Sequence, residues 1–473
     1  MMRLTLFEFA AAVQGELLND VSDKSSHMVE GIVWDSRKIV TGCAFLALPG
    51  ERVDGNDFIA EAARKGAAAI ICTRMPDVSL VSLASEFKCL LIYVEDGTEA
   101  LTRLAAAWRE RLNARVVGIT GSTGKTSTKD FCASVLSQRF PTTATLANQN
   151  NELGVPNTVL SANEDDGALI VEMGMRGRGQ IERLCSFVKP AYAVITNIGV
   201  SHLELLGSRE NIARAKAELL EGIPDTGTAV LNADDAFTPF LIEHARLEER
   251  GVRIITYGLS RDADVRAQDI SYDDQGCARF ALVLPKGTRA EAELRLPGAH
   301  NVSNALAAAA LGVGIGLTAA EIARGLSVAE GSGMRMEVKH LPSGITVIDD
   351  AYNANPDSMR AALETLSGMS CKGKRIAVLG DMGELGPDEL ELHVQVGRQA
   401  AAAGLDMLIC VGNLARGIAE GAAQDGMDVE RIVVLPNVED AVACVESVAQ
   451  SGDIVLVKAS HFMGFDQIVK RMA

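Results

Sequence analysis

The 473-residue sequence contains few aromatic residues, few prolines and too little basic charge to balance its acids. Phe, Trp and Tyr make up 4% of the chain, and only 13 prolines argue against long proline-rich linkers. The 45 Lys and Arg residues are outnumbered by 62 Asp and Glu residues, which gives a net charge of −17. This balance disfavours non-specific binding to nucleic acid or an anionic membrane, because both need a basic face. It leaves phosphate ligands open, since a phosphate site needs only local N–H groups and one or two cations.

Closely spaced cysteines are also missing. The nine cysteines lie far apart in the sequence and include no C-x-x-C pair. Their pattern indicates neither a disulfide framework nor a cysteine zinc site. We therefore expect the cysteines to be small core residues of a protein in a reducing compartment.

No apolar segment is typical of a membrane anchor. Glu8 interrupts the apolar stretch at the N-terminus, so we expect no signal peptide. Residues 301–320 carry no charge, but half of them are Ala or Gly and two are Asn. This composition is typical of a buried helix and weak for a bilayer helix. We expect a soluble cytoplasmic protein with no membrane insertion.

Two long regions alternate short β-branched runs with amphipathic segments, which predicts βαβ units and mostly parallel sheets. In the last third of the chain, which we interpret as a Rossmann-like domain, strands are predicted at 345–350, 374–380, 405–412, 430–436 and 453–459. In the middle of the chain they are predicted at 114–120, 167–173, 191–199, 227–233 and 252–258.

The remaining segments differ from this rhythm. Residues 261–298 are typical of β-hairpins, and helices are predicted over 97–112 and 300–316. Residues 1–96 form a smaller α/β unit. Because domains usually contain roughly 100–200 residues, we expect an α/β protein with three domains. Their expected bounds are 1–97, 98–314 and 315–473.

The strongest local signal for function is GITGSTGKTSTKD at residues 118–130. An apolar strand leads into a glycine loop, and Lys125 and Thr126 open a helix, which is the context of a phosphate-binding loop. Glycines let backbone N–H groups turn inward around phosphates. Lys125 would reach the β- and γ-phosphates, and the Thr126 hydroxyl would bind Mg²⁺. The spacing departs from the strict eight-residue pattern, because the leading glycine is Gly118 and position 119 is Ile.

Other polar residues follow predicted strands or lie in predicted helices, and each has an ordinary structural interpretation when taken alone. Glu172 ends a buried strand, at the edge where α/β sheets bind ligands. His202 comes just after another strand, and Lys216 lies in a helix where a solvated lysine would be usual. Three further residues come in the last third. Taken alone, Asn304 would be a residue at a helix end, Arg335 a surface charge and Asp350 a turn residue. Their joint occurrence in this order favours a functional role.

Taken together, these segments resemble the Mur ligase family of cell-wall precursor synthesis. The resemblance spans nearly the whole chain and rests on G-I-T-G-S-T-G-K-T, the E-M-G strand end, T-N-I-G…S-H-L-E, A-K-A-E-L, H-N-V-S-N-A-L-A-A, M-R-M-E and D-D-A-Y-N-A-N-P-D-S-M. It implies a small α/β N-terminal domain for the UDP-muramoyl-peptide, a central P-loop ATPase-like domain and a C-terminal Rossmann-like ligase domain.

Within the family, the chain is most similar to members that add D-alanyl-D-alanine to UDP-N-acetylmuramoyl-tripeptide. The segments NQNNELGVPNT and VLGDMGELG carry this likeness, and N-A-N-P-D stands where diaminopimelate-adding members usually have D-N-P-R. The resemblance implies an ATP-driven amide synthesis, in which a substrate carboxylate becomes an acyl phosphate that an amine then attacks. In such chemistry the protein mainly supplies positioning and charge neutralisation.

The resemblance also implies roles for individual residues. The implied catalytic residues are Lys125, Glu172, His202 and Lys216, and the implied ligands of two Mg²⁺ ions are Thr126, Glu172, His202 and Lys216. Lys216 matches a lysine that several members carry as a carbamate, which would make CO₂ a requirement. The implied ATP-binding residues are Gly121, Ser122, Thr123, Gly124, Lys125, Thr126, Ser127, Asn304 near adenine, Arg335 at a phosphate and Asp350 at the ribose.

Substrate contacts are implied in all three domains. Asp35, Ser36 and Arg37, with the loop 47–58, resemble a uridine-nucleotide pocket. The residues implied for the muramoyl-peptide and the acceptor are Asn148, Asn150, Asn151, Tyr352, Asn353, Lys458 and Ser460. One segment departs from the family pattern V-K-G-S-R, because this chain has Ala459 and His461 there. If that arginine position holds the acceptor carboxylate, acceptor affinity would differ.

Two other functions remain open on the sequence. One is a ligase of the same fold for another acceptor, such as a folate-polyglutamylating or sister enzyme, although the D-S-R unit at 35–37 argues against the folate version. The other is an ATP-binding scaffold without catalysis, which the joint presence of Lys125, Glu172, His202 and Lys216 disfavours. We expect a monomer that acts on small-molecule substrates.

Overall fold

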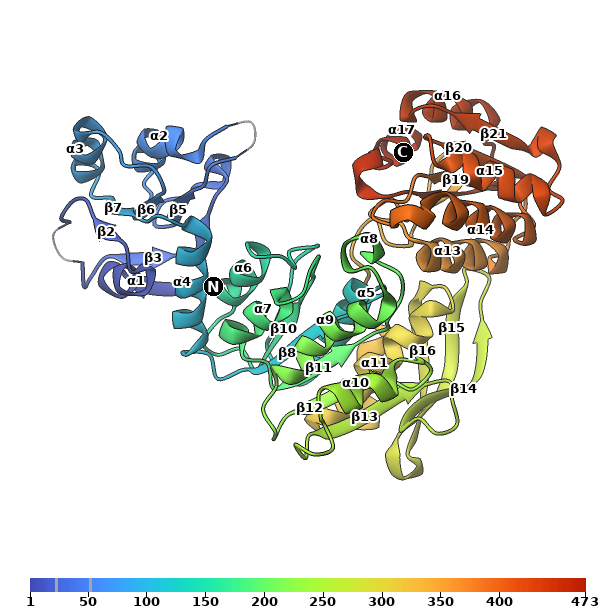
Figure 1. Cartoon of the computed structure of the whole chain (residues 1–473), viewed down its shortest axis with the longest axis horizontal. Coiled ribbons are helices and arrows are strands. Elements are labelled where there is room, and N and C mark those ends of the chain that lie inside the picture. The colour runs from blue at the N-terminus through green and yellow to red at the C-terminus, as the bar shows by residue number, and fades with distance from the viewer. Residues whose placement is uncertain (22–23, 51–52) are drawn as a thin grey trace. The chain divides into compact units, whose positions relative to one another are not determined.

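The computed structural model describes residues 1–21, 24–50 and 53–473, and it has a mixed α/β fold (Figure 1). The contacts divide the chain into two compact units. The first contains residues 1–117, 140–173 and 182–190, and the second contains 118–139, 174–181 and 191–473. Among the described residues, no helix is long and apolar enough to cross a membrane.

The N-terminal part of the first unit is a small α/β structure. Its five-stranded sheet has the order β2-β7-β6-β5-β4. The antiparallel edge strand is β2 (Glu16–Leu17), and the parallel strands are β7 (Leu90–Tyr93), β6 (Ala69–Cys72), β5 (Ala44–Ala47) and β4 (Ile32–Val33). A separate antiparallel ribbon joins β1 (Arg3–Thr5) to β3 (Met28–Glu30). The helices are α1 (Leu6–Val13), α2 (Ile59–Arg64), α3 (Val78–Glu86) and α4 (Gly97–Arg109), and α4 confirms the predicted connecting helix.

The rest of the first unit carries the strand that ends at Glu172. Strand β10 (Ala168–Glu172) pairs in parallel with β9 (Thr142–Ala144). A further bond ties this region to β8 (Arg115–Thr120). The N–H of Arg115, the first residue of β8, donates to the carbonyl of Gly167, just before β10. Two helices belong to this region, α6 (Gly154–Ser161) and most of α7 (Gln180–Val188).

The second unit begins within β8 and continues into a parallel sheet. Beside the end of β8 lie β11 (Tyr192–Ile195), β12 (Thr228–Asn232) and β13 (Arg253–Gly258), in that order. The predicted hairpins follow as β14 (Val265–Tyr272), β15 (Cys277–Val283) and β16 (Arg289–Pro297), which pair antiparallel. The helices are α5 (Lys125–Leu136), α8 (Leu203–Leu206), α9 (Arg209–Glu221), α10 (Thr238–His244), α11 (His300–Ile315) and α12 (Ala319–Ser327).

Helix α11 confirms the interpretation of the uncharged span 301–320. Its residues from Asn304 to Gly312 are buried inside the protein, and it ends at Gly316, which has a left-handed φ of 91°. Glycine is favoured at such a helix end because other residues are strained there. The cysteines are likewise free thiols, seven of them buried, as expected for small core residues.

The C-terminal part of the second unit is a sheet covered by helices on both faces (Figure 1). The strand order is β17-β18-β22-β19-β20-β21. The parallel strands are β18 (Thr346–Asp349), β22 (Ile454–Lys458), β19 (Arg375–Gly380), β20 (Met407–Val411) and β21 (Ile432–Leu435), and all five were predicted. The antiparallel strand β17 (Glu337–His340) was not predicted. One face packs on α13 (Pro356–Gly368), α14 (Glu389–Ala402) and α15 (Ala415–Gln424), and the other on α16 (Val438–Val448) and α17 (Asp466–Met472).

Helices α14 and α15 approach each other closely at glycines. A Cβ atom on Gly397 would lie 2.0 Å from the Ile418 carbonyl oxygen, so only glycine fits there. We expect Gly397→Ala to lower the free energy of unfolding by at least about 2 kcal/mol, because the clash is with backbone. Gly368 in α13 has nothing within 4 Å of its Cβ position and is the matched control. Urea denaturation followed by circular dichroism measures both, and equal midpoints would contradict the packing argument.

Candidate active site

The loop between β8 and α5 has the backbone of a phosphate cradle. Gly121 has a φ of 155° and Gly124 a φ of 76°, and α5 begins at Lys125. A Cβ on Gly121 would lie 1.8 Å from the Thr196 hydroxyl oxygen, and one on Gly124 would lie 2.4 Å from the Asn304 side-chain oxygen. A side chain at Gly121 would therefore displace Thr196, and one at Gly124 would displace Asn304. The N-terminus of a helix favours an anion, because the positive ends of its peptide dipoles point outward there.

The segment 196–199, which follows β11, holds this loop in place. The Asn197 side-chain oxygen accepts the Thr123 N–H at 3.0 Å, and the Asn197 amide donates to the Thr123 hydroxyl at 2.9 Å. The Thr196 hydroxyl donates to the Thr123 carbonyl at 2.6 Å. The Ser122 hydroxyl accepts the Gly199 N–H at 2.8 Å. The loop backbone is thus fixed before any ligand is bound.

Side chains of α5 and α11 complete the loop. The Lys125 ammonium donates to the Gly121 carbonyl at 2.8 Å, which places its charge over the glycine loop. Thr126 is buried in the first turn of α5, and Ser127 follows it. Asn304 lies behind Gly124, where its oxygen accepts the Thr128 hydroxyl at 3.2 Å. The predicted ATP-binding residues of the loop and Asn304 are therefore brought together.

Lys216 is a buried amine on α9. The side chain is 2% exposed. Burial lowers the pKa of the Lys216 amine well below its ordinary value of 10.5, and the charge of Lys125 lowers it further. A buried lysine without a compensating carboxylate favours its neutral form, because desolvation penalises the charge. A neutral amine is also the form that can react with CO₂.

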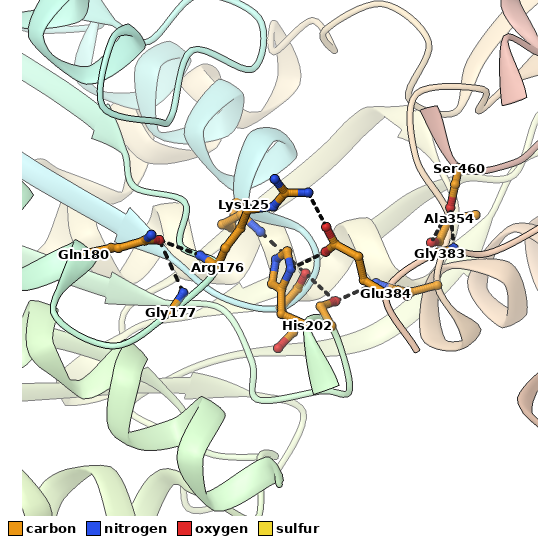
Figure 2. A network of polar contacts seen from close by, with 12 residues as sticks. Lys125, Arg176, Gly177, Gln180, His202, Ala354, Gly383, Glu384 and Ser460 are labelled. Atoms are coloured by element: carbon orange, nitrogen blue, oxygen red, sulfur yellow. Dashed lines mark hydrogen bonds and ion pairs between the residues drawn. The ribbon is translucent and has the colours of Figure 1, made fainter. Parts of the chain in front are cut away.

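His202 is held by a carboxylate from the C-terminal part of the unit. Figure 2 shows Glu384 between His202 and Arg176. One Glu384 oxygen lies 2.5 Å from His202 Nδ1, and the other accepts the Arg176 guanidinium at 2.5 Å. Burial lowers the pKa of His202 below 6.5, the charges of Lys125 and Lys216 add to this, and Glu384 opposes them. The imidazole is therefore neutral at pH 7, which is the form that binds metal ions.

The last β-strand of the chain braces two loops, the one that carries Arg335 before β17 and the one that carries Tyr352 after β18. The Lys458 ammonium, 1% exposed, donates to the Asp350 carboxylate at 2.5 Å and to the Asn353 carbonyl at 2.9 Å. The other Asp350 oxygen accepts the Met336 N–H at 3.1 Å. The buried ion pair thus holds both loops, and it stays paired because an unpaired charge there would be costly.

A stack of side chains joins these two loops. The Arg335 guanidinium lies 4.3 Å from the centroid of the Tyr352 ring. Tyr352 also stacks on His461, with ring centroids 5.3 Å apart. Ser460 accepts the Gly383 N–H at 3.0 Å, so it joins this region to the loop that presents Glu384 (Figure 2). The two positions that depart from the family pattern, Ala459 and His461, therefore flank a residue that positions backbone.

In the first unit, Glu172 lies among asparagines. Its carboxylate is fully buried and accepts the Asn150 amide at 2.8 Å, and Asn150 also donates to the Asn148 side-chain oxygen at 2.8 Å. Asn151 caps the start of α6, where its side-chain oxygen accepts the Gly154 N–H at 2.9 Å. These predicted residues are brought together at the end of β10.

The predicted uridine-nucleotide residues form a surface turn. Both Asp35 oxygens accept the Arg37 guanidinium at 2.9 Å, and this partner lowers the pKa of Asp35 to about 2. The Ser36 carbonyl accepts the Lys65 ammonium at 2.9 Å. In the predicted loop 47–58, Glu51 and Arg52 lie outside the described residues.

Sequence reasoning gave no role to four residues that build the site. Thr196 and Asn197 hold the glycine loop, and Arg176 and Glu384 hold His202. All but Arg176 lie in segments that carried the family resemblance, T-N-I-G and VLGDMGELG. The available signal was their position in or shortly after predicted strands, at the edge where α/β sheets bind ligands.

The strand, glycine loop and helix of the second unit define a nucleotide-binding α/β protein of the P-loop type. Three family models match the chain: the Mur ligase family catalytic domain at 28–109, the Mur ligase middle domain at 119–312 and the Mur ligase glutamate ligase domain at 334–461. The chain belongs to the Mur ligase family and has its three-domain architecture.

Similar proteins include two enzymes named UDP-N-acetylmuramoyl-tripeptide–D-alanyl-D-alanine ligase. The one from Bacillus subtilis is 36% identical over 99% of this chain and 98% of its own length, and the one from Escherichia coli is 34% identical over 100% and 99%. Among solved structures, MurF from Acinetobacter baumannii matches with a TM-score of 0.85 and 32% identity over 100% of this chain and 99% of that chain. MurF ligase from Thermotoga maritima in complex with ADP matches at 0.77 and 27%, over 94% and 97%.

The glycine loop yields a direct test. We expect Gly121→Ala to weaken ADP binding at least about tenfold, because the new methyl group would displace Thr196 and the N–H groups it orders. Gly177→Ala is the matched control, since nothing lies within 4 Å of its Cβ position. Isothermal titration calorimetry measures both affinities. Unchanged binding by Gly121→Ala would show that the loop does not hold the phosphates.

Proposed function

We propose that this chain is an ATP-dependent ligase that adds D-alanyl-D-alanine to UDP-N-acetylmuramoyl-tripeptide, which yields the UDP-muramoyl-pentapeptide precursor of peptidoglycan. The observation that carries the proposal is 34–37% identity to enzymes of this name over nearly the entire chain. The fixed glycine loop supports it, because activation of a carboxylate requires a held triphosphate.

The proposed reaction has two steps. The tripeptide carboxylate attacks the γ-phosphorus of ATP, which releases ADP and leaves an acyl phosphate. The amine of D-alanyl-D-alanine then attacks the acyl carbon, and inorganic phosphate and a proton leave as the amide forms. The N-terminus of α5 and the charge of Lys125 would hold the phosphates in line. Arg335 would bind a phosphate, Asp350 the ribose, and Asn304 the adenine side.

We also propose that Thr126, Glu172, His202 and Lys216 hold two Mg²⁺ ions. In support, His202 is neutral and Thr126 is buried at the start of α5. Among the described residues, no three His, Cys, Asp or Glu side chains are grouped as a metal site. A hydroxyl group and a carbamate on Lys216 would therefore have to complete the donor set. The bound ions would neutralise phosphate charge.

Substrate contacts follow the same proposal. Domains with bounds near 1–97, 98–314 and 315–473 would bind the uridine nucleotide, ATP and the acceptor respectively. Asp35, Ser36 and Arg37 would contact the uridine nucleotide. The residues proposed for the muramoyl-peptide and the acceptor are Asn148, Asn150, Asn151, Tyr352, Asn353, Lys458 and Ser460. The enzyme would work as a cytoplasmic monomer.

Acceptor choice tests the function. We expect phosphate release from ATP only when both UDP-N-acetylmuramoyl-tripeptide and D-alanyl-D-alanine are present. EDTA should abolish it, because the charge of the phosphates would be left unbalanced. A coupled phosphate assay with a panel of acceptors measures this. Full turnover with free lysine or diaminopimelate in place of the dipeptide would refute the proposal, as would turnover that persists in EDTA.

Lys216 gives a second test. The Lys216→Met variant is expected to lose at least about 100-fold in turnover while it still binds ADP, because a methionine cannot form a carbamate. Its free energy of unfolding at pH 8 should equal or exceed that of the wild type. The folded-state pKa of Lys216 lies below the unfolded value of 10.5, so the wild type loses stability as pH falls between these values.

The same variant separates the carbamate from a simple lysine role. Wild-type turnover should fall in CO₂-free buffer and return when bicarbonate is added, and Lys216→Met should not respond. Carbon-13 NMR after labelling with ¹³C-bicarbonate should detect a carbamate in the wild type only. Full activity of either Lys216→Met or the CO₂-depleted enzyme would contradict the proposed carbamate.

A further inference from the structure

Ser201 connects the glycine loop to the C-terminal part of the second unit. Its hydroxyl donates to the Ser122 carbonyl at 3.2 Å and accepts the Asn355 side-chain amide at 2.8 Å. Ser122 belongs to the loop itself, whereas Asn355 immediately precedes α13. A single hydroxyl group thus bridges two segments that are more than 200 positions apart in the sequence.

The loop end of this connection is rigid. Ser122 is buried, its N–H donates to the Asn197 carbonyl at 3.0 Å, and its hydroxyl accepts the Gly199 N–H at 2.8 Å. Ser122 is therefore tied to segment 197–201 at three points. Because these bonds are short and local, contacts that a bound phosphate makes with the loop would restrain Ser201 as well.

The C-terminal end is equally defined. Asn355 is the N-cap of α13, and its side-chain oxygen accepts the Ser358 N–H at 2.9 Å. The Ser358 hydroxyl in turn accepts the Asn355 N–H at 3.0 Å. The oxygen of the Asn355 amide caps the helix while the nitrogen binds Ser201. The orientation of the amide is thus fixed by the cap.

We propose that Ser201 is a positioning residue that couples nucleotide binding in the glycine loop to docking of the N-terminus of α13. The inference rests on the proposed ligase function, since amine transfer needs the C-terminal domain against the ATP site. A serine has one hydroxyl proton, so donation to Ser122 leaves its lone pairs for Asn355. The coupling depends on this direction, and an acceptor at position 355 would compete with Ser122 for the same proton.

Other contacts lie beside this bridge but do not replace it. The Cβ position of Gly386 would lie 3.2 Å from the backbone of Glu204, and that of Gly199 would lie 2.7 Å from an Asp357 oxygen. These are close approaches without a directional bond. Glu384 binds His202 and Arg176 rather than the glycine loop. Ser201 therefore joins the loop to the start of α13 by directional hydrogen bonds.

Asn355→Asp is the sharpest variant. Aspartate keeps the oxygen that caps Ser358 and is itself a good N-cap, but it removes the donor to Ser201. We expect kcat to fall about fivefold, as the loss of one hydrogen bond predicts, with the KM for D-alanyl-D-alanine nearly unchanged. Ser201→Ala should show the same loss, and Ser201→Thr, which keeps the hydroxyl, should restore most of it.

Ser358→Ala is the matched control. It weakens the cap of α13 without touching Ser201, so it should lower thermal stability but leave kcat near the wild-type value. If Ser358→Ala lowers kcat as much as Asn355→Asp does, the effect belongs to helix stability and the proposal is wrong. A rise in the dipeptide KM with kcat unchanged would assign Asn355 to acceptor binding and also overturn it.

Hydrogen exchange tests the coupling without ligase turnover. In the wild type, a non-hydrolysable ATP analogue with Mg²⁺ should slow amide exchange at 353–360, and this slowing should be absent in Ser201→Ala although the analogue still binds. Equal slowing in both proteins would overturn the coupling. A wild type that shows the slowing but has no ligase activity would refute the proposed function and leave the coupling intact.

Discussion

The site depends on one constraint, which is that the backbone from Gly121 to Gly124 keeps one defined conformation. Two glycines permit the geometry, but they do not enforce it. Thr196 and Asn197 enforce it through hydrogen bonds to Thr123, and the Gly199 N–H enforces it through a bond to the Ser122 hydroxyl. An acidic chain of net charge −17 thereby holds the N-terminus of α5 and the Lys125 ammonium, which both attract anions, on an ordered backbone.

The C-terminal part of the second unit contributes a carboxylate, Glu384, to the residues around His202. Glu384 reaches His202 and Arg176 from a loop that is itself held by Ser460 and by His393, whose Nε2 accepts the Met382 N–H at 2.9 Å. Lys458 holds Asp350 and the loop beside Arg335 in the same way. Buried polar residues of the C-terminal part therefore hold the loops that present the half-buried Glu384 and Arg335 side chains.

The local sequence pattern was enough to predict much of this architecture. The glycine loop, helix α11 and the five parallel strands of the last third were predicted because each is defined by a few consecutive residues. Strand β17 was not, since it exists only by pairing with β18. The contacts of Glu384 with His202 and of Asn355 with Ser201 were equally invisible, because they join residues 182 and 154 positions apart. Side-chain partners at such separations are set by the fold as a whole.

The contact between Glu384 and His202 also determines which nitrogen of the imidazole carries the proton. A carboxylate beside Nδ1 keeps the hydrogen on that atom, so the lone pair of the neutral ring is on Nε2. Without Glu384, the two tautomers would exchange freely, and only one presents Nε2 as a donor to a metal ion. The C-terminal sheet, through one side chain, thus fixes the tautomer of a residue that belongs to the central domain, and with it the nitrogen that the proposed metal site would use.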